Sequence, residues 1–325
     1  YLCKLRTNKQ FYPLQLDTKT KTLISGTPRS AFYRQGGLLD VAVQKRKDGN
    51  YIFLCYSKLT ANNNLTVAIS KSKLFGNKLI KTRDIFISNH SSKSGVHFGC
   101  RLALNDTHLF ASLGDRGDRT NAQNPDNHSG SIIKMPLDGK TTTGNLGWLS
   151  EIYSIGHRNP QGLFYNSELK IIMNTEHGPK GGDEVNFNFL DENRQKNFGW
   201  PISSYGKPYP GFEEIFKKNG WMQTSHKENG FVEPTKHFTP AIGISELFLL
   251  QNKNDKKHNR LFVSSLRAGS IYVLTLDETF KKVLDEDRLY FPNKRIRDLK
   301  YDKKNNQFLF LSEYTPSIAV LKKND

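Results

Sequence analysis

Short apolar segments separated by polar turns run along most of the chain. They are rich in β-branched and aromatic residues and are bounded by Gly, Asn, Asp and Lys, a composition typical of strands and turns. The clearest segments are 51–56, 65–69, 131–135, 170–173, 260–263, 270–274 and 307–311. Because strands of this length and spacing recur while long helical periodicities are few, the pattern predicts an all-β sandwich, barrel or propeller.

A weak internal repeat distinguishes between these architectures. Each unit has an apolar strand, a polar turn, a second apolar strand and then a small or acidic residue. The units are residues 38–56, 101–115, 162–176, 247–265 and 297–313. Self-similarity at roughly 40–50 residues is typical of blades around a central channel, so the repeat favours a β-propeller. The Gly-, Pro- and aromatic-rich stretch 200–240 predicts an insertion over one mouth of that channel, and residues 1–325 are interpreted as a single propeller domain.

Charge changes this interpretation little. The chain carries 48 Lys and Arg against 31 Asp and Glu, a net charge of +17. Such a balance raises the hypothesis of a nucleic-acid or anionic-surface partner. The lysines are dispersed through polar loops, so a dedicated nucleic-acid site is disfavoured, although the charge still attracts anionic ligands. No apolar run reaches the ~18 residues that predict a membrane span.

The cysteines and the N-terminus bear on the compartment. The chain has an odd number of cysteines and no CxxC pair; they are Cys3, Cys55 and Cys100. This pattern argues against a zinc site and against a framework of several disulfides, but it is compatible with one disulfide. The chain opens at Tyr1 without an apolar signal segment, so we expect a mature form or a fragment.

Candidate chemistry lies at the predicted strand ends. His97 precedes one predicted strand and Asp115 follows its partner, so the two can meet at one end of a hairpin. A carboxylate that holds a histidine ring prepares a general base. The alternative interpretation is a lone polar histidine in a turn.

Two further loops and one strand carry polar groups. Arg158 and Asn159 offer donors for an acidic or quinone-like ligand, or form a surface turn. Residues 175–186 combine carboxylates with Gly and Pro, which leave carbonyls available for a hard cation such as calcium, or simply end a strand. Arg295 and Arg297 alternate with Ile296, so they share one strand face and favour an anion there.

Taken together, these segments resemble the glucose/sorbosone dehydrogenase family, which are six-bladed propellers that bind pyrroloquinoline quinone (PQQ) in the channel mouth. The resemblance follows the family's order over nearly the whole chain. The matching stretches are residues 35–40, 97–101, 114–116, 157–162, 176–186, 197–201 and 295–298. Each motif alone is weak, but the combination is specific. It implies a six-bladed propeller with an incomplete first blade, since the family has a strand pair upstream of the stretch that residues 1–5 resemble.

The resemblance also implies an activity: PQQ- and Ca²⁺-dependent oxidation of aldose sugars at the anomeric carbon. His97 matches the general base and Asp115 its orienting partner, with hydride transfer to the quinone. Arg158 and Asn159 match residues at the quinone oxygens. Gln35 matches a residue that contacts sugar or cofactor.

Further residues take implied roles in holding the cofactor and metals. Gly178 and Pro179 match carbonyl ligands of the catalytic calcium, and Glu184 and the Phe198 carbonyl match a second, structural calcium site. The remaining matches, to cofactor or substrate contacts, are Gln123, His177, Arg267, Arg295 and Arg297. Arg267 stands where well-known members carry Lys, and His177 where some carry Gln.

Alternatives and partners follow from the same comparison. A cofactor-free binding module, as in the hedgehog-interacting relatives, predicts decay at His97, Arg158 or Arg297, and these residues are intact. A calcium-dependent propeller hydrolase such as a lactonase needs carboxylates converging from several blades. For the dehydrogenase, the resemblance implies a sugar substrate, an external electron acceptor, no nucleic acid, a monomer or homodimer, and a periplasmic or secreted location.

Overall fold

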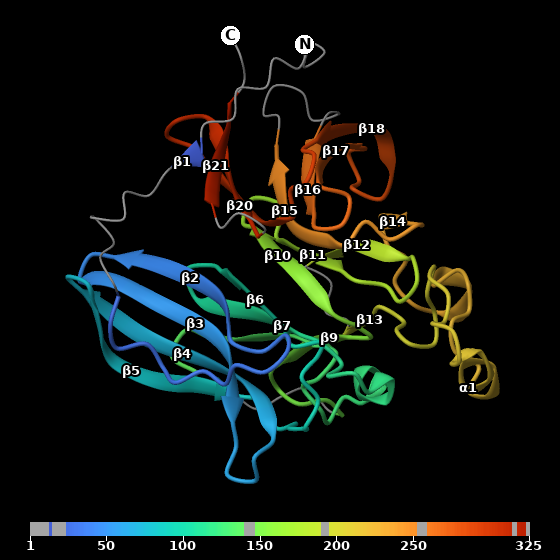
Figure 1. The fold of residues 1–325 in the computed structure, drawn as a ribbon, viewed down its shortest axis with the longest axis horizontal. Helices are drawn as coiled ribbons and strands as arrows, with labels where there is room; N and C mark the ends of the chain where they lie inside the picture. The colour runs from blue at the N-terminus through green and yellow to red at the C-terminus, as the bar shows by residue number, and fades with distance from the viewer. Residues whose placement is uncertain are drawn as a thin grey trace.

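The computed structural model describes residues 13–14, 24–139, 147–189, 195–251, 259–313 and 317–322. These residues form five sheets, which are arranged as blades around a common centre (Figure 1). The predicted all-β propeller is therefore confirmed, with five of the six predicted blades within the described residues. Cys3 and the stretch 1–5 lie outside them.

Each sheet is built almost entirely from antiparallel neighbours. The first sheet contains β2 (Leu38–Arg46), β3 (Gly49–Leu59), β4 (Leu65–Phe75) and β5 (Lys78–Ile87). The second contains β6 (Gly99–Leu104), β7 (His108–Leu113), β8 (Ser131–Pro136), β9 (Ile152–Ile155) and the short parallel β13 (Lys196–Asn197). The third contains β10 (Pro160–Asn166), β11 (Ile171–Glu176), β12 (Asp183–Phe189) and β14 (Lys236–Phe238).

The last two sheets complete the described propeller. The fourth contains β15 (Ile244–Leu250), β16 (Asn259–Ser265), β17 (Ser270–Leu276) and β18 (Val283–Tyr290). The fifth contains β19 (Ile296–Asp302), β20 (Gln307–Ser312), β21 (Ser317–Lys322) and β1 (Pro13–Leu14). The described helices are α1 (Glu213–Lys218) and the 3-10 turns η2 (Arg119–Gln123) and η3 (Lys227–Asn229), and none of them is long and apolar enough to cross a membrane.

The predicted repeat corresponds to the two innermost strands of every sheet. The five repeat units span β2–β3, β6–β7, β10–β11, β15–β16 and β19–β20. The first strand of each unit packs against the next around the centre, from β2 through β6, β10 and β15 to β19. The first sheet along the chain has four strands, and the N-terminal strand β1 is instead the outer strand of the last sheet, where Pro13 pairs with Ala319.

Apolar side chains fill the spaces between neighbouring blades. Phe53 of β3 and Leu109 of β7 belong to one buried cluster between the first two sheets. Ile171 of β11 and Leu261 of β16 belong to another between the third and fourth. Because a middle strand packs against a blade on each side, its residues are buried on both faces, which explains the continuous apolar runs in the sequence.

A disulfide joins the first two blades. Cys55 of β3 and Cys100 of β6 are bonded, with their Cα atoms 5.7 Å apart. The sequence is compatible with one disulfide but does not identify its two cysteines. The pairing follows only from the packing of the two sheets. Disulfides are typical of proteins outside the cytoplasm.

The innermost strand of every sheet carries an irregularity near its first residues. The register shifts occur between Leu38 and Asp40, Gly99 and Leu102, Pro160 and Gly162, Ile244 and Leu247, and Ile296 and Asp298. A β-bulge redirects the side chain at the extra residue and is common beside functional sites. Here the shifts include Arg101, Gln161 and Arg297.

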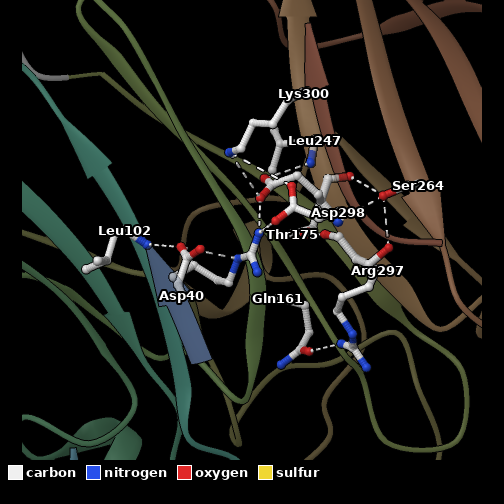
Figure 2. Close-up of polar contacts among 12 residues, drawn as sticks. Asp40, Leu102, Gln161, Thr175, Leu247, Ser264, Arg297, Asp298 and Lys300 are labelled. Carbon is white, nitrogen blue, oxygen red and sulfur yellow. Dashed lines mark hydrogen bonds and ion pairs between the residues drawn. The ribbon is translucent and has the colours of Figure 1, made fainter. Parts of the chain in front are cut away.

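Charged side chains from four innermost strands meet in the centre of the propeller. Buried Arg101 lies 2.9 Å from Asp298, 3.7 Å from Asp40 and in contact with Glu246. Figure 2 shows Asp40 also accepting the Leu102 amide at 2.8 Å, and Lys300 beside Asp298. This central cluster connects the first, second, fourth and fifth blades by polar contacts.

Candidate active site

A cavity of about 670 Å³ opens at the end of the propeller where the innermost strands begin. Its volume is within the range of ~300–1,000 Å³ typical of ligand sites. Its lining residues are Gln35, His97, Arg158, Asn159, His177, Gly178, Pro179, Lys180, Gly181, Asp183, Lys207, Tyr209, Thr239, Pro240, Ala241, Gly243 and Arg267. Most of the predicted site residues therefore share one cavity, and the insertion 200–240 contributes Lys207, Tyr209 and two residues after β14 to its wall.

His97 and Asp115 form the predicted pair. The His97 Nδ1–H donates to Asp115 Oδ1 at 2.7 Å, with 18% of the His97 side chain exposed against 1% of Asp115. His97 adopts a left-handed conformation with φ of 51°, which is uncommon for a residue other than glycine. Gly114 allows this approach, since a Cβ there would lie 2.3 Å from the His97 carbonyl oxygen.

Other contacts fix the backbone of the His97 loop. Gln35 Oε1 accepts the His97 amide at 2.7 Å, so Gln35 supports the loop as well as lining the cavity. The Arg116 guanidinium donates to the carbonyls of Val96 and Ser94 and lies 3.4 Å from the centre of the Phe98 ring. In the sequence, Arg116 is only part of a motif that matches the family, and no role for its side chain follows from that match.

Asp115 is buried but remains charged. Burial alone raises the pKa of Asp115, but the hydrogen bond from His97, the charges of His97 and Arg158, and the Gly117 amide lower it below its usual value. Its second oxygen, Oδ2, accepts the indole N–H of Trp200 at 2.8 Å. The sequence alone gives no sign of this contact, because Trp200 follows Asp115 by 85 positions.

Arg158 lies beside this pair at the cavity wall. Its guanidinium donates to the His177 carbonyl at 3.0 Å and lies 5.3 Å from the Trp200 ring centre. Its backbone amide donates to Glu176 Oε2 at 2.7 Å, and its carbonyl accepts the Asp115 amide at 2.9 Å. The charged end of Arg158 is thus positioned by rigid groups, as electrostatic catalysis requires.

The Gly178–Pro179 loop offers backbone carbonyls rather than acidic ligands. Gly178 donates its amide to Asp183 at 3.1 Å, and Asp183 also accepts the Ile242 and Ile244 amides at 3.0 Å. A Cβ on Gly178 would lie 2.2 Å from the Gly181 oxygen, so the loop needs glycine there. Among the described residues no group of three His, Cys, Asp or Glu forms a metal site, so a cation here depends on carbonyl oxygens.

Tyr209 and His177 border this loop. The Tyr209 hydroxyl donates to the Pro179 carbonyl at 3.1 Å, a contact that the sequence did not reveal. His177 Nε2 donates to the Ile244 carbonyl at 2.6 Å, and burial lowers the pKa of His177 to about 4. His177 is therefore a neutral hydrogen-bonding group at neutral pH.

The predicted arginines occupy the side of the site nearest the fifth blade. Arg267 lines the main cavity and also a neighbouring cavity of about 280 Å³, which Arg295 lines as well. Arg295 and Arg297 both bind Glu313, at 2.8 Å and 2.6 Å from their Nε atoms, which agrees with their predicted common face. Figure 2 shows Arg297 reaching Gln161, whose Oε1 accepts its Nη1–H at 2.9 Å.

Glu184 lies behind the main cavity. It lines a space of about 10 Å³ with Glu176, Ser203 and His226, large enough for a single water or ion. Burial and the charge of Glu176 raise the pKa of Glu184 well above its usual value. The buried Ser203 Oγ and His226 Nδ1, on two residues that line this space, have no hydrogen-bond partner among the described residues.

Gln123 and Phe198, like Asp115, Glu184, Arg295 and Arg297, do not line the main cavity. Gln123 exchanges hydrogen bonds with Asn197 at 2.7 and 3.1 Å and donates to the Trp200 carbonyl at 2.7 Å. Phe198 is buried, and its ring lies 4.7 Å from that of His157. The structure therefore places both around the loop that carries Trp200.

Comparison with known proteins identifies the family that this chain resembles in sequence. Residues 8–319 match the family model described as Glucose / Sorbosone dehydrogenase. An uncharacterized protein of Synechocystis sp. is 32% identical over 285 residues, covering 82% of this chain and 66% of that protein. Quinoprotein glucose dehydrogenase B of Acinetobacter calcoaceticus is 25% identical over 292 residues, covering 68% of this chain and 59% of that protein.

A solved structure extends the similarity to the fold. The soluble aldose sugar dehydrogenase of Escherichia coli, in its apo-form, superposes with a TM-score of 0.78 at 28% identity, over 92% of this chain and 85% of that one. The chain spans less than two thirds of the length of the two sequence relatives.

Proposed function

Because this chain belongs to the glucose/sorbosone dehydrogenase family, we propose that it oxidises aldose sugars at the anomeric carbon with PQQ and calcium. The observation that carries the proposal is the His97–Asp115 pair at the wall of the same cavity as Arg158 and the Gly178–Pro179 carbonyls. A base, a cation and a carbonyl loop around one cavity suit a proton abstraction coupled to oxidation.

His97 takes the proton from the anomeric hydroxyl in this proposal. Its Nδ1–H is used by Asp115, so Nε2 is the ring atom left to accept a proton. Asp115 stabilises the imidazolium that forms, because its own pKa is held below the usual value. PQQ, when bound, supplies the two-electron acceptor for the hydride from the anomeric carbon.

The cavity fits an anionic quinone cofactor. Its described lining contains Arg158, Lys180, Lys207 and Arg267 against Asp183, whose oxygens are occupied by backbone amides. Arg158 would stabilise negative charge at the quinone oxygens with Asn159 beside it. Gln35, His177 and Arg267 would contact the cofactor, and Arg295 and Arg297 would bind its carboxylates from the fifth blade. Gln35 would also contact the sugar. Gln123 is left out of the proposed sugar site, because its amide is bound to Asn197 and the Trp200 carbonyl outside the main cavity.

Calcium would bind at two places. Gly178 and Pro179 would hold the catalytic ion through their carbonyls, where a Lewis acid polarises a quinone. Glu184 and the Phe198 carbonyl would hold the structural ion. The raised pKa of Glu184 and the unpartnered polar atoms beside it support this, since a cation there would relieve the repulsion from Glu176.

The proposal includes a periplasmic or secreted location, which the Cys55–Cys100 disulfide supports. The test is reconstitution of the purified chain with PQQ and calcium, followed by dye reduction over a panel of aldoses. Sugar-dependent reduction that requires PQQ and disappears with a chelator is expected. Absence of PQQ binding by a folded chain contradicts the proposal and favours a cofactor-free binding module.

A further inference from the structure

Trp200 touches both charged groups of the candidate site. The edge of its indole donates to Asp115 Oδ2 at 2.8 Å, and its face lies 5.3 Å from the Arg158 guanidinium carbon. The side chain is only 5% exposed. One rigid aromatic ring therefore lies between the orienting carboxylate and the cation.

The surroundings of Asp115 make this indole important. Oδ1 accepts both His97 Nδ1–H and the Gly117 amide, each at 2.7 Å. Among the described residues, Trp200 is the donor to Oδ2, and Asp115 is only 1% exposed. Without the indole N–H, a buried carboxylate oxygen would lose its hydrogen-bond partner. An unsatisfied buried group destabilises the folded state, and more so when it is charged. Among the described residues the carboxylate would then be held only at Oδ1, so its orientation toward His97 would be less well fixed.

The position of the indole is itself fixed. The Trp200 amide donates to the Gly156 carbonyl at 3.0 Å, and its carbonyl accepts Gln123 at 2.7 Å. The ring packs with Ala122 and Phe216 in a small buried cluster. Since backbone and side chain are both held, the N–H donor keeps a constant direction toward Asp115, which is what positioning a catalytic group requires.

We propose that Trp200 is a positioning residue for the reaction at His97: its indole N–H fixes Asp115, and through Asp115 the His97 ring, while its face supports Arg158. This inference rests on the proposed function. It goes beyond it by assigning a role to a residue that does not line the main cavity.

The first test needs no cofactor. In unliganded protein labelled with ¹⁵N-tryptophan, the 3 Trp residues give distinct indole signals. We expect the Trp200 signal, identified by its loss in Trp200→Phe, to lie downfield as a charge-assisted donor and to move in Asp115→Asn. An unmoved signal in Asp115→Asn would overturn the proposal even if Trp200→Phe failed to fold.

The second test is kinetic. Trp200→Phe keeps an aromatic face for Arg158 but removes the donor, so kcat should fall on the order of 10–100-fold while KM stays nearly constant. The kcat of Trp200→Leu should be lower still, because this variant also removes the aromatic face. In an Asp115→Asn background, Trp200→Phe should cause no additional loss, because both changes break one contact. The matched control is Trp148→Phe, whose ring packs against the cluster between the first two blades and not against the Trp200 cluster, and which should leave kcat unchanged.

The outcomes separate the two proposals. A folded Trp200→Phe with wild-type kcat, or with a loss that adds fully to that of Asp115→Asn, would contradict the positioning role. If the wild-type chain oxidises no sugar, the proposed function fails, and the indole signal still decides whether Trp200 fixes Asp115.

Discussion

The Cys55–Cys100 disulfide predicts a large and measurable contribution to stability. It connects two blades and closes a loop with a sequence separation of 45, for which the loss of chain entropy in the unfolded state corresponds to about 4 kcal/mol. Total stabilities are usually about 5–15 kcal/mol, so reduction should remove a large fraction of the free energy of unfolding.

Urea unfolding of the oxidised and the reduced chain measures the contribution of the disulfide to the free energy of unfolding, without any substitution. With a urea dependence of about 1–3 kcal/mol per molar, the midpoint of the reduced protein should fall by roughly 1–4 M. The slope should rise, because an unfolded chain without the cross-link exposes more surface. The urea midpoint of the double variant Cys55→Ala/Cys100→Ala should fall at least as far, since both cysteines are fully buried.

The control is Cys3→Ala, which removes the third thiol so that labelling counts only the disulfide pair. Mass spectrometry after alkylation confirms that both sulfurs are reduced. If the reduced chain then unfolds at the same urea concentration as the oxidised chain, the cross-link does not constrain the unfolded state and the reasoning is refuted.

Three further outcomes are expected. His97→Ala should abolish sugar oxidation and retain PQQ, measured by dye reduction and by absorbance of the bound cofactor; loss of PQQ binding would show that His97 has another role. Arg101→Gln should lower the free energy of unfolding by about 3–5 kcal/mol, because it removes the buried cation that contacts Asp40, Glu246 and Asp298; a urea midpoint close to wild type would contradict this. Burial holds the pKa of His128 below its ordinary value of 6.5, so below that pH the unfolded chain binds a proton that the folded chain does not, and stability falls. His128→Gln should therefore lose less stability than the parent between pH 7.5 and 5.5, and an equal loss in urea midpoint would exclude this contribution.

Most of the fold could be predicted from the sequence, because strands and turns are indicated by residues that are close together in the chain. The strand segments, such as 51–56 within β3, combine apolar runs with turn residues at both ends. The repeat units reproduce the two inner strands of every described sheet, since each blade must bury the same faces. The β-bulges were not predicted, because a register shift depends on how two strands pair and not on either strand alone.

The candidate site was accessible in part. The motifs that resemble the family placed His97, Arg158 and Pro179 at one cavity. The contacts from Trp200 to Asp115 and from Tyr209 to Pro179 join residues 85 and 30 positions apart, and only the packed blades bring them together. The disulfide belongs to the same class, because pairing two cysteines requires their Cα distance.

The most direct test of the central claim is a single turnover without an external dye. The PQQ- and calcium-loaded chain is mixed anaerobically with an aldose, and the absorbance of bound PQQ and the sugar products are followed together. We predict reduction of the cofactor with formation of one equivalent of product oxidised at the anomeric carbon, and no reduction in His97→Ala. Bound PQQ that stays oxidised across the whole panel of aldoses would contradict the proposed dehydrogenase.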